Sequence, residues 1–246
     1  MNMASISESG HKKNVANLEN LIAFCNNHVE TYKPANSAIS IDALNQKLTE
    51  ALNSLEVVNQ KLALHNNALE ARQSAFKPLT SIVNKVVYAS KASSLPSLII
   101  ADIETISRKI KGVRKTPKVT QNPEEQTEAR NYISVSQLGF DDRIENFSKL
   151  IELVKVQESY KPNESELTID GLTSLLDKMK STNSDAINAL NPLSNARIDR
   201  NKILYDDSTG LVYLGTTSKT YVKSVFGPSS PEYKLISKLR FTKIKQ

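Results

Sequence analysis

A fifteen-residue stretch of this chain occurs twice, and the repeat limits the fold more than any other feature of the sequence. Residues 30–44 (ETYKPANSAISIDAL) and 158–172 (ESYKPNESELTIDGL) align without a gap at an offset of 128 residues. This period is too long for a solenoid repeat, so it indicates duplication of a whole module. In a chain of 246 residues we therefore expect two related units in tandem.

Each copy contains residues that begin a helix. The proline keeps the residue before it out of the helical conformation and so ends the preceding element. A hydroxyl residue stands at the N-cap, and an aspartate two positions later places negative charge at the positive end of the helix dipole. Ile39 with Leu44, and Leu167 with Leu172, have the spacing of a hydrophobic staple. The helix-start motif consists of Tyr32, Pro34, Ser40 and Asp42 in the first copy and Tyr160, Pro162, Thr168 and Asp170 in the second.

Apolar residues then recur in alternating steps of three and four, which predicts a long helix with a heptad seam in each copy. The two runs, residues 41–76 and 169–204, would each span about 54 Å at 1.5 Å per residue. We expect Pro192 to kink the second run. The seam positions are Ile41, Leu44, Leu48, Ala51, Leu55, Val58, Leu62, His65, Leu69, Arg72 and Phe76, then Ile169, Leu172, Leu176, Met179, Asn183, Ala186, Leu190, Leu193, Arg197, Arg200 and Leu204.

Three arginines and one asparagine occupy seam positions that are otherwise mostly apolar. A buried guanidinium without a carboxylate is costly, so the helix ends bearing Arg72, Arg197 and Arg200 should leave the core or meet acidic groups. We expect Asn183 to fix the register of the seam rather than to bind a ligand.

Shorter helices flank both long ones, and the low content of glycine (7 residues) and aromatics (6%) agrees with a helical fold. The pattern predicts helices over residues 14–31, 78–92, 96–111, 144–156 and 217–226 and from residue 232, with residues 211–214 as an alternative short strand. The predicted fold class is all-α: an elongated bundle of two tandem homologous units with long central helices. The expected organisation is a disordered N-terminus (1–12), helical unit 1 (13–111), a linker (112–133) and helical unit 2 (134–246).

Residues with catalytic or ligand-binding chemistry are sparse. The histidines are scattered without metal-ligand spacing, Cys25 lies on an apolar helical face, and there is no glycine-rich phosphate loop. These features predict a protein without catalytic, cofactor or metal sites. With no signal peptide, no transmembrane run and a single cysteine, we expect a cytoplasmic location.

Two basic clusters are candidates for binding an acidic partner such as nucleic acid. Cations near helix C-termini are also favoured by the helix dipole alone, and no aromatic platform accompanies them, so this structural interpretation is preferred. The clusters are Arg108, Lys109, Lys111, Arg114, Lys115 and Lys118, and Lys234, Lys238, Arg240, Lys243 and Lys245.

Several segments of the second half resemble a family of bacterial all-helical duplicated proteins with no assigned activity. They are residues 193–205 (LSNARIDRNKILY), 209–212 (TGLV), 221–227 (YVKSVFG) and 230–234 (SPEYK). The resemblance implies a bacterial origin and a duplicated helical fold, and it supplies no cofactor or site residue.

The leading functional hypothesis is a non-catalytic structural or scaffold protein that forms homo-oligomers or binds a protein partner through its long helical surfaces. The alternative is an adaptor for nucleic acid or another acidic polymer. A third hypothesis, membrane perturbation by residues 95–106, rests on a short and interrupted apolar segment.

Overall fold

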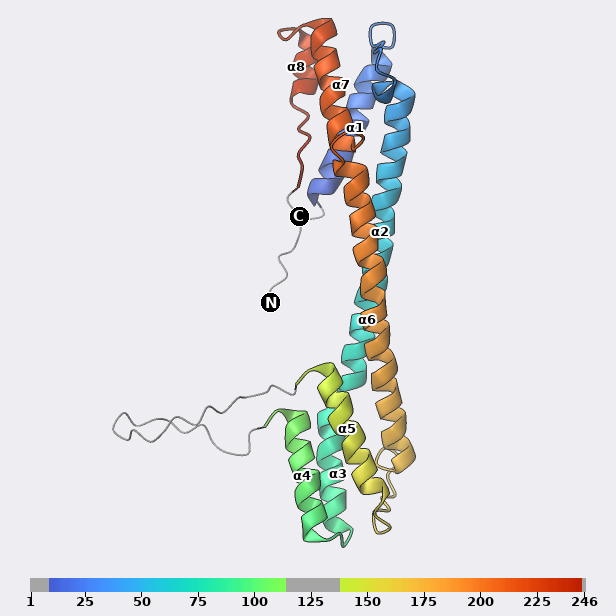
Figure 1. Ribbon diagram of the computed structural model, residues 1–246, viewed down its shortest axis with the longest axis vertical. Helices are drawn as coiled ribbons and strands as arrows, with labels where there is room; N and C mark the ends of the chain where they lie inside the picture. The colour runs from blue at the N-terminus through green and yellow to red at the C-terminus, as the bar shows by residue number, and fades with distance from the viewer. Residues whose placement is uncertain (1–8, 114–137, 245–246) are drawn as a thin grey trace, which may run out of the picture. The chain divides into compact units, whose positions relative to one another are not determined.

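The computed structural model describes residues 9–113 and 138–244, which form α-helices and one 3-10 turn, with no strand in either stretch (Figure 1). The all-α prediction is confirmed. Residues 1–8 of the expected disordered N-terminus, residues 114–133 of the expected linker, and Lys245 lie outside the described residues. The elements are α1 (Ser9–Asn27), η1 (Ser37–Ile39), α2 (Ile41–Phe76), α3 (Leu79–Ala92), α4 (Ser97–Lys111), α5 (Phe140–Lys155), α6 (Ile169–Tyr205), α7 (Leu211–Phe226) and α8 (Pro231–Ser237).

The chain divides into two compact units, and both long helices contribute to each. Unit 1 contains residues 1–65 and 189–246, and unit 2 contains residues 66–188. Each unit therefore combines the first part of one long helix with the last part of the other. This spatial division differs from the expected sequence units 13–111 and 134–246, because each core draws helices from both halves of the chain.

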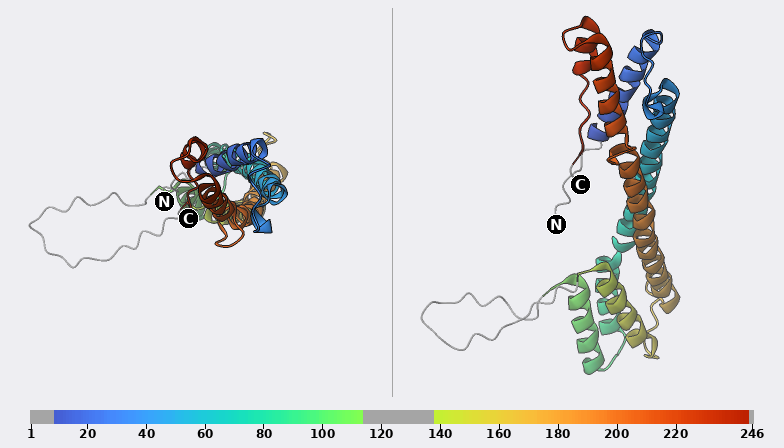
Figure 2. Two further views of the ribbon diagram at one scale, coloured as in Figure 1. Left: turned by 90° about the horizontal axis from the view of Figure 1, so that it is seen from above. Right: turned by 45° about the horizontal axis from the view of Figure 1, so that its top comes forward.

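In unit 1, the beginning of α2 packs against the end of α6. Leu44 shares a core with Leu204, and farther along α2 Val58 packs with Leu193 and Ala196. Residue numbers rise on α2 as they fall on α6, so the two helices are antiparallel here. α1 and α7 lie side by side in both Figures 1 and 2 and complete this core.

In unit 2, the end of α2 and the beginning of α6 share a core with α3, α4 and α5. Phe76, Phe147, Leu172 and Met179 are buried in it together. The packing is again antiparallel, since Arg72, which precedes Phe76, contacts Asn183, which follows Met179.

The two helix-start motifs form the same contacts, one in each unit. In the first copy the Tyr32 hydroxyl donates to the carbonyl of Ile39 at 2.8 Å, and Ser40 Oγ accepts the N–H of Ala43 at 3.2 Å. In the second copy the Tyr160 hydroxyl donates to the carbonyl of Leu167 at 3.0 Å. There the cap is also present, because Thr168 Oγ1 accepts the N–H of Gly171 at 3.1 Å. The predicted N-caps are thus present in both copies.

The copies differ at one position, which yields a prediction. A Cβ on Gly171 would overlap the carbonyl oxygen of Ser165, whereas its counterpart Ala43 carries a Cβ. Gly171→Ala should lower the free energy of unfolding by about 2 kcal/mol, because the loop backbone must move. An unstrained helical Gly→Ala change would instead raise it by up to about 1 kcal/mol. Urea unfolding measures the sign, and Ala43→Gly, costing less than about 1 kcal/mol, is the matched control.

Several local predictions need correction. α1 begins at Ser9, so residues 9–12 are helical rather than disordered, and it ends at Asn27 rather than residue 31. Residues 211–214 belong to α7 and are not a strand. α6 continues as one helix through Pro192, whose side chain lies exposed, and the expected kink there stays a prediction. The carbonyl of Asn188, which loses its helical N–H partner there, lies on an exposed residue where water can replace the bond.

Candidate functional surfaces

The tyrosines of the helix-start motifs lie in the cores of the two units, whereas Asp42 and Asp170 are exposed. Tyr32 and Tyr160 are buried, and their hydroxyls are committed to main-chain carbonyls. Burial raises the pKa of both phenols, that of Tyr160 to about 12. These contacts give the motifs a structural role.

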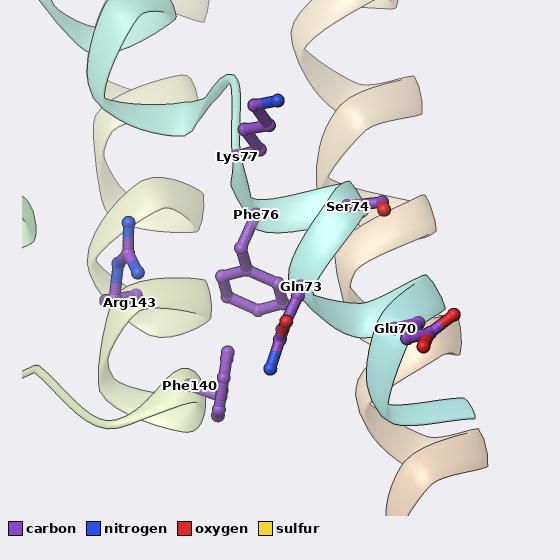
Figure 3. Close-up of a pocket in the computed structure, with 7 residues that line it drawn as sticks. All are labelled: Glu70, Gln73, Ser74, Phe76, Lys77, Phe140 and Arg143. Carbon is purple, nitrogen blue, oxygen red and sulfur yellow. The ribbon is translucent and has the colours of Figure 1, made fainter. Parts of the chain in front are cut away.

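An open pocket of about 680 Å³ lies in unit 2, where α2 ends and α5 begins (Figure 3). In Figure 3 the rings of Phe76 and Phe140 lie beside each other, Arg143 extends from α5 next to them, and Glu70 points away from Arg143. The lining residues are Glu70, Gln73, Ser74, Phe76, Lys77, Phe140 and Arg143.

Beside this pocket, two arginines and two phenylalanines pack against one another. The rings of Phe76 and Phe140 meet edge to face, with centroids 4.8 Å apart. The guanidinium of Arg72 lies 4.0 Å from the centroid of Phe140, and that of Arg143 lies 5.6 Å from Phe76. Such cation–π contacts stabilise a partly desolvated cation. Burial lowers the pKa of Arg143, although arginine stays protonated. The lining itself carries two cations, Lys77 and Arg143, and one carboxylate, Glu70.

The polar seam residues form a network in unit 2. Arg72 donates to Asn183 Oδ1 at 3.3 Å, and Asn183 Nδ2 donates to Asp141 Oδ1 at 2.7 Å. Arg72 was expected to leave the core or to contact an acidic group. It instead binds the amide of Asn183, which in turn binds the carboxylate of Asp141. The side chain of Asn183, on α6, thus contacts both α2 and α5, and its role in fixing the register of the seam stays a prediction.

The seam arginines of unit 1 lie in different surroundings. Arg200 is 3% exposed and donates to Asn201 Oδ1 at 2.9 and 3.1 Å, while Arg197 is half-buried. The end of α6 bearing Arg200 therefore stays in the core.

The first basic cluster is partly engaged within unit 2. Arg108 donates to Thr105 Oγ1 and Lys111 donates to Asn84 Oδ1, at 2.7 and 2.9 Å, while Lys109 is exposed. These residues form the last turn of α4, as the dipole interpretation expects. Arg114, Lys115 and Lys118 lie outside the described residues.

The second basic cluster lies in unit 1 on α8 and the segment after it. Lys234, Lys238 and Arg240 are exposed, and Lys243 pairs with Asp207 at 2.8 Å. The structure divides the two clusters between different units.

The remaining reactive side chains are structural or dispersed. Cys25 is fully buried, and burial raises the pKa of its thiol to about 11. His28 Nδ1 lies 2.9 Å from the carbonyl of Phe24 and its ring stacks on that residue. Within residues 9–113 and 138–244, no three His, Cys, Asp or Glu side chains gather where they could hold a metal ion.

No helix in the described part of the chain combines the length and apolarity needed to cross a bilayer. Comparison with protein-family models, curated proteins and solved structures finds no match in any of the three.

Sequence reasoning missed the pocket in unit 2. Phe140 and Arg143 are three residues apart and therefore share a helical face, which is a detectable signal. Their partner Phe76 lies 64 residues earlier than Phe140, and periodicity does not show which helices meet.

Proposed function

We propose that this protein is a non-catalytic structural subunit that assembles with other copies of itself through the outer faces of its long helices. One observation carries the proposal. On the part of α2 that belongs to unit 1, Val57 and Leu64 are 41% and 57% exposed. They lie one heptad apart and so occupy the same face of the helix.

The surroundings of this face are poor in charge. Within residues 57–65 the sequence carries one charged side chain, Lys61, and residues 189–196 of α6 carry none. Leu190, within this uncharged stretch of α6, is also exposed. Helical surfaces in contact with water are usually rich in Lys, Arg, Asp and Glu, whereas exposed apolar residues among uncharged ones favour protein contact.

The matching helix-start motifs support the further idea that the chain arose by duplication and offers two similar faces in an elongated bundle. We also propose that the protein belongs to the bacterial helical family that its sequence resembles, and that it is located in the cytoplasm.

Light scattering across a range of concentrations tests self-assembly. We expect the mass to rise above 27.3 kDa with concentration. Val57→Lys with Leu64→Lys should hold the protein at the monomer mass, because each buried lysine would require an ammonium to be desolvated. Leu98→Lys, at a 72% exposed position of α4, is the matched control and should assemble like the unchanged protein. A strict monomer at high concentration would contradict the proposal.

A second candidate function is binding of an acidic polymer. The exposed side chains of Lys234, Lys238 and Arg240 favour it, since they lie close together in sequence on one unit. Replacing all three with glutamine should abolish a salt-sensitive mobility shift with duplex DNA. Absence of any shift for the unchanged protein at low salt would exclude this function.

A further inference from the structure

The segment after α8 lies against α1 and is held there through its main chain. In Figures 1 and 2 it runs from α8 towards the beginning of α1. Asn14 of α1 is 2% exposed; its Nδ2 donates to the carbonyl of Thr242 at 2.8 Å, and its Oδ1 accepts the N–H of Thr242 at 3.0 Å. Asn17, on the same face, donates to the carbonyl of Arg240 at 2.7 Å. Two asparagines thus bind main-chain groups of this segment.

α7 supplies a third anchor. Lys219 Nζ donates to the carbonyl of Leu239 at 2.6 Å and to that of Ser237 at 3.1 Å. These two contacts satisfy carbonyls at the end of α8 and the start of the segment, so α7 fixes where the segment enters. Together α1 and α7 form what we call the tail groove, defined by Asn14, Asn17, Lys219 and two glycines described next.

The two glycines make room for apolar side chains. A Cβ on Gly215 of α7 would lie 2.5 Å from the ring of Phe241, and one on Gly10 of α1 would lie 2.6 Å from Ile244 Cδ1. Phe241 and Ile244 are half-buried and pack against the core of unit 1. The groove therefore accepts an extended segment with apolar residues three positions apart.

Peptide-binding grooves bind an extended segment by hydrogen bonds to its main chain and by pockets for its apolar side chains. The tail groove has both features. We propose that the tail groove also receives residues 239–244 of a second copy, so that assembled copies exchange these segments. The groups that hold the segment belong to α1 and α7 rather than to α8. A neighbouring copy therefore presents the same set. Exchange, as in domain swapping, conserves the contacts of Asn14 and Asn17 with the segment, while the bond from Lys219 to Ser237 stays within the chain. This inference rests on the proposed self-assembly.

Mixed cross-linking tests the exchange. In a Cys25→Ala background, one preparation carries Asp207→Cys and another carries Lys243→Cys. These two side chains lie 2.8 Å apart, are exposed and do not belong to the tail groove. The preparations are mixed and treated with a short bismaleimide. We expect a two-chain product on a denaturing gel from the mixture, well above the amount given by either preparation alone. Adding Asn14→Leu to the Asp207→Cys chain should reduce this product about tenfold, because two hydrogen bonds to the segment are lost.

The variant with Asp207→Cys and Lys243→Cys in one chain provides the reference. An internal cross-link in this variant without a two-chain product from the mixture would show that the segment stays within its own chain, which would overturn the exchange. Failure of both reactions would show that the groove does not hold the segment, and would overturn it equally. Light scattering on the same mixture separates the proposals, since oligomers without cross-linking leave self-assembly standing, whereas monomers without cross-linking contradict both.

Discussion

Replacing Leu172 with alanine lowers the free energy of unfolding by about 3 kcal/mol. Leu172 is 0% exposed and shares the core of unit 2 with Leu167 and Phe147. Its removal forfeits the burial of apolar atoms and leaves a cavity that surrounding helices cannot fully close. Guanidinium unfolding followed by circular dichroism measures the change.

The counterpart of Leu172 in the first helix-start motif is Leu44, which is also 0% exposed and lies with Ile39 in the core of unit 1. We expect Leu44→Ala to cost a similar amount, because the staple is equivalent in both copies. Leu98→Ala, at an exposed position, should change the stability by less than about 0.5 kcal/mol. A loss at one leucine without a comparable loss at the other would contradict the equivalence of the motifs.

Raising the pH above 9 should destabilise the fold. Burial raises the pKa of Cys25 from 9.0 to about 11, and burial together with the charge of Glu164 raises that of Tyr160 from 10.0 to about 12. The unfolded chain therefore releases these protons first, so the contribution is fully present below pH 9 and is lost between pH 9 and 12. The loss is on the order of 2 kcal/mol for each group.

Unfolding by urea at pH 8 and pH 11 measures this dependence. Cys25→Ala should remove the part of the loss that begins near pH 9. Tyr160→Phe should remove only its own share of the part that begins near pH 10, because burial raises the pKa of Tyr32 as well. Tyr160→Phe should also cost about 1 kcal/mol at pH 8, since the hydrogen bond to Leu167 is lost. Stability that stays constant from pH 8 to 11 would show that these groups are solvated in the folded protein.

Local features of the fold could be predicted from the sequence because local devices specify them. The cap at Ser40 and the apolar period placed α2 at residues 41–76, which are the bounds observed. All predicted seam residues of α2 are buried or half-buried, and on α6 only Leu190 departs from this among the predicted seam positions. A heptad seam is the buried face of a helix, and its apolar period identifies that face from the sequence alone.

The partners of these seams could not be predicted. A heptad pattern shows that one face of a helix is covered but not which helix covers it. The sequence therefore suggested two units in tandem, whereas each compact unit joins the start of one long helix to the end of the other. The tail groove was missed for a related reason, since Asn14 and Thr242 are 228 residues apart and neither belongs to a recognisable motif.

Dividing the chain tests this sharing of helices most directly. Two fragments, separated by a cut within residues 114–137, are expressed apart and together, and their masses and thermal unfolding are measured. If each unit needs helices from both halves, the fragments bind each other in a 1:1 complex that unfolds cooperatively, and neither fragment alone is a folded monomer. Two fragments that each fold as stable monomers and do not bind one another would contradict the account.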